Sequence, residues 1–275
     1  MTFGIVGLGL MGGSFGKALK KYNLAINVYG YDHNKVHQSQ ALELGLVDKI
    51  CTLEELKKCD VIILAIPVDG IIAFMQHIKD IDINTTVIDL GSTKEIIVNN
   101  IPTSIRKNFI AAHPMTGTEK FGPKSAIDNL YEEKIVVLCN LEDNSALHIE
   151  RTKNIFENMN MKIVYMDAKE HDIHACYMSH LPHAISFGLA YTVMDHEAPR
   201  ESITLAAGGF RDMSRIAKSS ADMWNDIFRQ NRDNLIESLG IFEKNMSDAK
   251  QMLIDEDYEN LSKWINKANN LHKIL

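Results

Sequence analysis

One histidine lies at the end of a predicted strand, where ligands meet α/β sheets. His113 follows the apolar run of residues 109–112, and ligands of open α/β sheets bind outside the carboxyl ends of the strands. An imidazole there is suited to accept the proton of a substrate hydroxyl group, because its reference pKa lies near neutrality. A loop histidine held by a backbone carbonyl is the alternative interpretation. The position therefore indicates a general base for the oxidation of an alcohol.

A glycine-rich segment near the first residue is typical of dinucleotide binding. Gly7, Gly9 and Gly12 form the pattern GxGxxG between a short apolar strand and a predicted helix over residues 13–21. The first glycine allows a tight turn, the second lets a pyrophosphate approach the backbone, and the third lets helix and strand pack closely. The free N–H groups of the helix N-terminus would bind the phosphates. A glycine-rich turn without a ligand is the alternative, but this context favours a nucleotide site.

An acidic residue follows the second predicted strand and bears on the choice of cofactor. Asp32 comes twenty residues after Gly12. A carboxylate at this position accepts hydrogen bonds from the ribose hydroxyl groups of NAD and repels the 2′-phosphate of NADP. Lys35 is close enough in sequence to soften that discrimination. We predict NAD as the cofactor.

Two periodicities alternate over the first 167 residues. Short apolar runs rich in β-branched residues recur, and polar segments with helical spacing separate them. This alternation predicts a parallel sheet that is covered by helices on both faces. The predicted strands are residues 3–6, 27–31, 61–66, 86–90, 109–112, 135–138 and 162–165. Candidate capping boxes at Thr52-Leu53-Glu54-Glu55 and Ser92-Thr93-Lys94-Glu95 indicate where two of the helices begin.

The strand pattern ends at Asp167, and the remaining sequence is helical. Breaks are expected at Pro199, at Gly208-Gly209 and at Gly240. We predict an α/β Rossmann-type domain with a parallel sheet over residues 1–167, followed by an all-α domain over residues 168–275. The helical half has more apolar positions than one sheet domain can easily bury, which favours a homodimer formed through this half.

Composition and charge exclude several classes of protein. Of the 275 residues, 45% are hydrophobic and 24% are charged, which is typical of globular domains. The net charge of −7 argues against nucleic acid as a partner, because such proteins carry a basic face. The longest apolar run, residues 61–68, is too short to span a membrane. With no basic n-region at the start and no CxxC pair, we expect a cytoplasmic protein whose four cysteines are reduced.

A cluster of histidines early in the helical half is a weaker candidate site. Helical spacing places Cys176, His180 and His183 roughly on one face, as a zinc site would require. No carboxylate completes an obvious set of ligands and Pro182 disturbs the helix, so we predict no metal. The other histidines of the cluster, which we expect on the surface, are His171 and His174.

Several segments together resemble the prephenate dehydrogenase family. They occur in the same order from the first strand to about Phe228, and the segments HPMTGTE and SHLPH make the resemblance specific. In place of the Asp-Pro that often precedes Met-Trp in the family, this chain has Ser220-Ala221-Asp222. The matching segments are the glycine pattern with Asp32, Asp89-Leu90-Gly91-Ser92-Thr93-Lys94, residues 113–119, 179–183 and 208–217, and Met223-Trp224.

The resemblance implies roles for individual residues in proton handling and substrate binding. His113 accepts the hydrogen bond of the substrate's ring hydroxyl group, and Ser92 orients that hydroxyl and the histidine. Arg215 binds a substrate carboxylate, for which a planar guanidinium is well suited, although Arg211 competes for this role. The substrate pocket and its mouth are further implied to include His183, Trp224, Gly208 and Glu119, the last as part of an ionic network.

The resemblance also implies an activity, the NAD-dependent oxidative decarboxylation of prephenate to 4-hydroxyphenylpyruvate in tyrosine biosynthesis. The substrate is a dianion whose ring becomes aromatic as hydride and carbon dioxide leave. Aromatisation drives the reaction, so the protein needs positioning and modest proton handling and no metal.

Three alternatives stay open at this point. Arogenate differs from prephenate only in an amino group in place of the keto group, and no residue of the sequence decides between them. A 3-hydroxyacid dehydrogenase would need a catalytic lysine near the start of the helical half, where Lys169 is the candidate, and it leaves SHLPH unexplained. A non-catalytic NAD sensor would leave His113 and Arg215 without a role.

Overall fold

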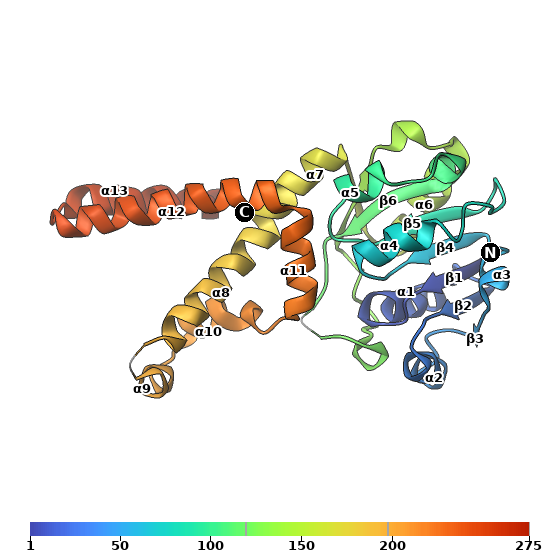
Figure 1. Cartoon of the computed structure of the whole chain (residues 1–275), viewed down its shortest axis with the longest axis horizontal. Helices are drawn as coiled ribbons and strands as arrows, with labels where there is room; N and C mark the ends of the chain where they lie inside the picture. Colours follow the sequence, from blue (N-terminus) through green and yellow to red (C-terminus); the bar gives the residue numbers. More distant parts are fainter. Residues whose placement is uncertain (119, 197, 275) are drawn as a thin grey trace.

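The computed structural model describes residues 1–118, 120–196 and 198–274, and it consists of a sheet half and a helical half (Figure 1). Eight strands form one sheet in the order β3-β2-β1-β4-β5-β6-β7-β8. All seven predicted strands are confirmed, and the two-residue edge strand β3 is additional. The strands are β1 (Thr2–Val6), β2 (Asn27–Tyr31), β3 (Lys49–Ile50), β4 (Val61–Leu64), β5 (Thr86–Asp89), β6 (Phe109–Pro114), β7 (Ile135–Cys139) and β8 (Lys162–Met166).

Two strands, β7 and β8, run opposite to the other six. Strands β1 to β6 pair in parallel, whereas β7 runs antiparallel to β6, and β8 is parallel to β7. The described part of the β6–β7 connection contains a 3-10 helix, η2 (Pro123–Ser125), and no α-helix. This is consistent with the antiparallel pairing, because a helical crossover usually joins parallel neighbours. This connection passes over the start of α1 (Leu10–Lys21), where the Tyr131 hydroxyl donates to the Met11 carbonyl at 2.8 Å.

The sheet has a hydrophobic core on each face, because successive side chains of a strand point to opposite sides. In β4, Val61 and Ile63 belong to one core, whereas Ile62 and Leu64 belong to the other, and all four are fully buried. The helices of the sheet half are α1, α2 (Lys35–Glu43), α3 (Leu53–Leu56), α4 (Val68–Met75), α5 (Glu95–Asn99) and α6 (Ala146–Asn158). Burial on both faces explains why the strands read as unbroken apolar runs.

The two candidate capping boxes have different outcomes. The Thr52 side chain accepts from the Glu55 amide and the Glu55 carboxylate accepts from the Thr52 amide, which confirms the first box. The second prediction is wrong, because α5 begins after Lys94 and has no side-chain cap from its own segment. Its free N–H groups are bound instead by a carboxylate from the helical half, as described below.

The helical half extends to one side of the sheet (Figure 1). A π-helical turn, η4 (Cys176–His180), precedes Pro182, which lacks the N–H that a regular helix would use there. The break predicted at Gly240 is wrong, since α12 passes through it without interruption. The helices are α7 (Ala168–Ala175), α8 (Leu181–Met194), α9 (Pro199–Thr204), α10 (Gly208–Ser214), α11 (Ala221–Gln230), α12 (Arg232–Ile254) and α13 (Tyr258–Asn269).

None of the helices in the described residues combines the length and apolar character that crossing a bilayer requires.

Candidate active site

The glycine-rich turn lies at the point where the strand order reverses. The chain leaves β1 toward β2 and later returns to β4 on the other side of β1, which is where ligands bind in such sheets. Gly7 has φ +88°, and a Cβ on it would lie 2.5 Å from the Ala65 carbonyl oxygen at the end of β4. A Cβ on Gly12 would lie 1.9 Å from the Gly7 carbonyl oxygen. Both positions therefore require glycine for steric reasons.

Gly9 has a different environment, because the space in front of it is open. A Cβ built on Gly9 would have no described atom closer than the Gly122 amide nitrogen at 3.9 Å. This open space faces the first turn of α1, whose amide groups lack partners within the helix. The turn is therefore shaped for a pyrophosphate, and the residues present fit a bound dinucleotide.

Asp32 is held against this turn at the end of β2. Its carboxylate accepts from the Leu8 amide at 2.9 Å and from the Asn34 amide at 2.8 Å, and its side chain is 5% exposed. The ring nitrogens of His33 and His37 each lie 3.6 Å from it. The carboxylate is thus fixed beside the nucleotide turn, where a ribose diol would lie.

A buried ion pair organises the turn after β5. The Lys94 ammonium group pairs with the Asp89 carboxylate and also donates to the Ala112 carbonyl at 2.8 Å. Asp89 accepts from the amides of Gly91 at 2.9 Å and Ala112 at 3.1 Å. Burial raises the pKa of Asp89, while Lys94 opposes this shift. The pair ties the turn that carries Ser92 to the residue that precedes His113.

His113 lies at the end of β6 as the first element of a chain of three side chains. Its Nδ1 atom is 2.8 Å from Nε2 of His171, and Nδ1 of His171 is 2.8 Å from the Asp172 carboxylate. His171 and Asp172 are each 2% exposed. The prediction that His171 lies on the surface is therefore wrong, whereas His174 is exposed as expected. α7 buries one face against the sheet half, a tertiary contact that sequence spacing did not indicate.

The surroundings of His113 disfavour its protonated form. Burial, followed by the neighbouring His171, Lys94 and His180, holds the pKa of His113 well below its usual range. Charged forms cost most in places that exclude water, particularly beside a cation. The imidazole is thus kept neutral and able to accept a proton at neutral pH.

An aromatic group from the helical half lies beside these histidines. The ring of His183 stacks on Trp224 with 3.7 Å between centroids, and His180 meets Trp224 edge-on at 6.1 Å. His183 is anchored by the Ser179 carbonyl at 2.8 Å, and His180 by the Asn231 amide group at 3.0 Å. The indole N–H of Trp224 is buried without a hydrogen-bond partner in the described part of the chain. The Trp224 indole thus carries a donor that no described residue uses.

The remaining predicted site residues differ in how well the structure positions them. Arg215 is exposed at the start of the 3-10 helix η5 (Arg215–Ala217), and it is close enough to lower the pKa of His183, which burial lowers most. Arg211 donates instead to the Ala206 carbonyl at 3.1 Å. Ser92 is partly buried, and Gly208 is an exposed residue at the start of α10. Glu119 lies outside the described residues.

The zinc alternative has no geometric support in the residues described. No group of three or more His, Cys, Asp or Glu side chains gathers there as metal ligands would. The Cys176 thiol lies 3.3 Å from the Ser238 hydroxyl, and His180 is engaged by Asn231.

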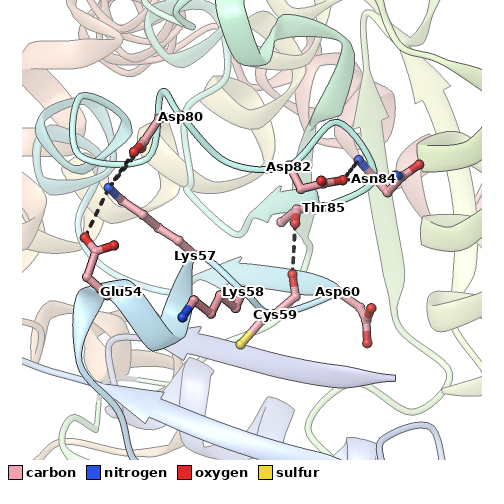
Figure 2. Close-up of a pocket in the computed structure, with 9 residues that line it drawn as sticks. All are labelled: Glu54, Lys57, Lys58, Cys59, Asp60, Asp80, Asp82, Asn84 and Thr85. Atoms are coloured by element: carbon pink, nitrogen blue, oxygen red, sulfur yellow. Dashed lines mark hydrogen bonds and ion pairs between the residues drawn. The ribbon is translucent and has the colours of Figure 1, made fainter.

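A hollow at the opposite ends of the strands, away from His113, is a competing location for a site (Figure 2). It lies at the amino ends of β4 and β5, between residues 54–60 and residues 80–85. One of its two lysines, Lys57, is paired with Asp80 at 2.9 Å and with Glu54 at 3.5 Å. The hollow offers mainly surface charges, while the histidines and the buried ion pair gather at the carboxyl ends of the strands.

Comparison with known protein families agrees with both halves of the structure. Residues 15–165 match the family model "Prephenate dehydrogenase, nucleotide-binding domain", and residues 167–267 match "Prephenate dehydrogenase, dimerization domain". A prephenate dehydrogenase of Bacillus subtilis is 30% identical over 97% of this chain and 74% of its own length. A cyclohexadienyl dehydrogenase of Zymomonas mobilis is 28% identical over 92% of this chain and 88% of its own length.

Two solved structures are similar to this chain over almost its whole length. The prephenate dehydrogenase of Aquifex aeolicus, crystallised with hydroxyphenyl propionate and NAD+, is 32% identical and superposes with a TM-score of 0.93. The alignment covers 99% of this chain and 97% of that one. An arogenate dehydrogenase of Synechocystis, at 23% identity and a TM-score of 0.84 over 99% of each chain, shares the fold.

Proposed function

This chain belongs to the prephenate dehydrogenase family, and we propose that it converts prephenate to 4-hydroxyphenylpyruvate with NAD as the oxidant. The observation that carries the proposal is the meeting of the two halves at His113. A neutral, partly buried imidazole at the end of β6 is linked to the helical half, close to the carboxyl ends of the strands. The relative from Aquifex aeolicus, crystallised with NAD+ and a hydroxyphenyl acid, supports this choice of reaction.

In this reaction the nucleotide turn and His113 have separate tasks. Gly7 and Gly12 shape the turn, the open space at Gly9 would take the pyrophosphate, and Asp32 would accept from the ribose hydroxyl groups. Bound NAD supplies the acceptor for the hydride of the substrate's ring carbon. His113 accepts the proton of the ring hydroxyl group as the hydride leaves, and it returns this proton to the same oxygen when loss of carbon dioxide makes the ring aromatic.

The helical half binds the rest of the substrate. Arg215 pairs with a substrate carboxylate, which must be met by a local cation because the chain carries a net charge of −7. His183 and Trp224 form one wall of the pocket, and Ser92 orients the ring hydroxyl. Gly208 and Glu119 complete the proposed substrate site on the strength of the family resemblance.

The same half also forms a homodimer in this proposal. Residues 167–267 match a dimerization domain, and large apolar side chains of the helical half are exposed in the single chain. They include Met178, Tyr191, Leu205, Leu253, Ile254 and Tyr258. An apolar surface of this extent is typical of a face that is covered by a partner. The four cysteines are free thiols, which fits a reducing, cytoplasmic location.

A single assay tests the activity and its main alternative. The protein is mixed with NAD and prephenate, then with NAD and arogenate, and the absorbance of NADH is followed. We expect NADH from prephenate. Turnover of arogenate alone would identify an arogenate dehydrogenase. The similarity to a cyclohexadienyl dehydrogenase is the reason for testing this alternative. Binding of NAD without turnover of either acid would refute the proposal in favour of a cofactor-binding protein.

A further inference from the structure

We infer that His171 and Asp172 are positioning residues that fix the tautomer of His113, so that its Nε2 atom carries the lone pair that faces the substrate. This inference rests on the proposed role of His113 as proton acceptor. It gives a role to two buried side chains of α7. Neither of them belongs to the glycine fingerprint, to the HPMTGTE segment or to the SHLPH segment.

The hydrogen-bond roles are fixed from Asp172 outward. The Asp172 carboxylate receives the backbone N–H groups of Lys94 at 2.7 Å and Glu95 at 2.9 Å. A backbone N–H can only donate, so both carboxylate oxygens act as acceptors in these contacts. This contact replaces the missing side-chain cap at the start of α5. The carboxylate therefore requires a donor from Nδ1 of His171, 2.8 Å away.

The next step passes along the histidine pair. A neutral imidazole has one donor and one acceptor, so a His171 that donates from Nδ1 accepts at Nε2. The atom facing it at 2.8 Å is Nδ1 of His113, which must therefore carry the hydrogen. Nε2 of His113 is left with a lone pair, and it forms no hydrogen bond with any residue in the described part of the chain. This is the form of the imidazole that a general base needs.

The three side chains are held by both halves of the molecule. His113 is on β6, and the amides that hold Asp172 follow β5, whereas His171 and Asp172 are on α7. From α11–α12, the Asn231 side chain donates to the Asp172 backbone carbonyl at 2.7 Å and to the ring of His180 at 3.0 Å. The base is thus set only when the helical half is docked on the sheet, where the substrate's two ends would be bound.

Charged and titratable groups around the pair favour this neutral arrangement. Lys94 and its partner Asp89 face His113 from the β5 turn, while His171, Asp172 and His180 face it from α7 and η4. When His113 takes the substrate proton, its Nδ1–H still donates to His171, and the nearby Asp172 carboxylate stabilises the positive charge. The proton returns to the substrate oxygen, so the relay ends in the state in which it began.

The tautomer can be measured directly in the unmodified protein. In uniformly ¹⁵N-labelled histidine spectra of the NAD complex at neutral pH, we expect both His113 and His171 to carry their hydrogen on Nδ1. Resonances are assigned with His113→Asn and His171→Gln. A His113 that carries its hydrogen on Nε2 would overturn the inference. This measurement needs no substrate, so its outcome is independent of whether prephenate is turned over.

Two substitutions separate positioning from packing. The amide of His171→Gln can donate to Asp172 and accept from His113, so kcat should stay within about fivefold of the unmodified enzyme. His171→Leu fills similar space without an acceptor, and kcat should fall about 10²-fold with KM for NAD unchanged, the scale of a mispositioned general base. His174→Leu, on the exposed side of the same helix, is the matched control and should keep full activity.

The contrast between the variants decides the outcome. Equal losses of kcat in His171→Gln and His171→Leu, or none in either, would show that His171 only fills space. If His171→Leu does not fold, as judged by loss of NAD binding, the ¹⁵N spectra of the unmodified protein still decide. An unmodified enzyme that does not oxidise prephenate would refute the proposed function, while the tautomer would remain testable.

Discussion

Removal of Lys94 is expected to be unusually costly because its charge is completely buried. Lys94 and Asp89 both have 0% exposed side chains, and the ammonium group is shared between the Asp89 carboxylate and the Ala112 carbonyl. Lys94→Met keeps the length of the side chain and leaves the carboxylate buried without its cation. Loss of one partner of a buried pair costs about 3–5 kcal/mol. Because Ala112 precedes His113, kcat should fall as well.

The assay is urea unfolding followed by circular dichroism, with the free energy of unfolding taken from the linear extrapolation. Asp89→Asn combined with Lys94→Met removes the stranded charge and should recover about 2 kcal/mol of the loss. Lys57→Met is the matched control, because its ion pairs with Asp80 and Glu54 lie at the surface, where such pairs contribute little. It should unfold close to the unmodified protein.

The pH dependence of the Lys94→Met variant follows from the same charge. Burial already raises the pKa of Asp89, and Lys94 is the main group that opposes the shift. Without Lys94 the folded-state pKa rises further above the unfolded value, so the folded variant takes up a proton that the unfolded chain does not bind. The difference in the free energy of unfolding between Lys94→Met and the unmodified protein should therefore become smaller as the pH falls. A loss under about 1 kcal/mol, or a gap independent of pH, would refute the role given to this pair.

The other predictions concern the cofactor, the base and the substrate anchor. Asp32→Ser should raise KM for NAD and relax selection against NADP in steady-state assays, and equal use of both cofactors by the unmodified enzyme would contradict this. His113→Asn should lower kcat by about 10²–10⁴-fold with little change in KM for NAD; retention of most of kcat would remove His113 from the mechanism. Since the pKa of His113 lies well below its usual range, kcat/KM of the unmodified enzyme should persist below pH ~6.5 and fall only when this imidazole protonates. Arg215→Ala should raise the Kd for prephenate by about 10–100-fold, the loss of a charged hydrogen bond, while Arg211→Ala changes it far less; titration calorimetry that shows equal Kd values for Arg215→Ala and the parent would place the anchor elsewhere.

The sequence alone determined the elements and the nucleotide turn. Apolar runs such as that of β4 are readable because both faces of the sheet are buried, which removes alternation. The requirement for glycine is local at Gly12, where a Cβ would meet the Gly7 carbonyl oxygen, and at Gly7 through its φ of +88°. The further contact of Gly7 with Ala65 comes from β4. The position of Asp32 could also be predicted from the sequence, because this residue comes directly after the last residue of β2.

Tertiary structure decided how His113 is held. Nothing in the local pattern separated His171 from His174, since the two lie on one helix three residues apart. Only the packing of α7 on the sheet half buries the first and leaves the second in solvent. The start of α5 shows the same limit: its own segment supplied a plausible cap, but the carboxylate of Asp172, far along the chain, took that place. The docking of the two halves determines which residues distant in sequence become hydrogen-bond partners. The spacing of residues along the chain does not indicate these partners.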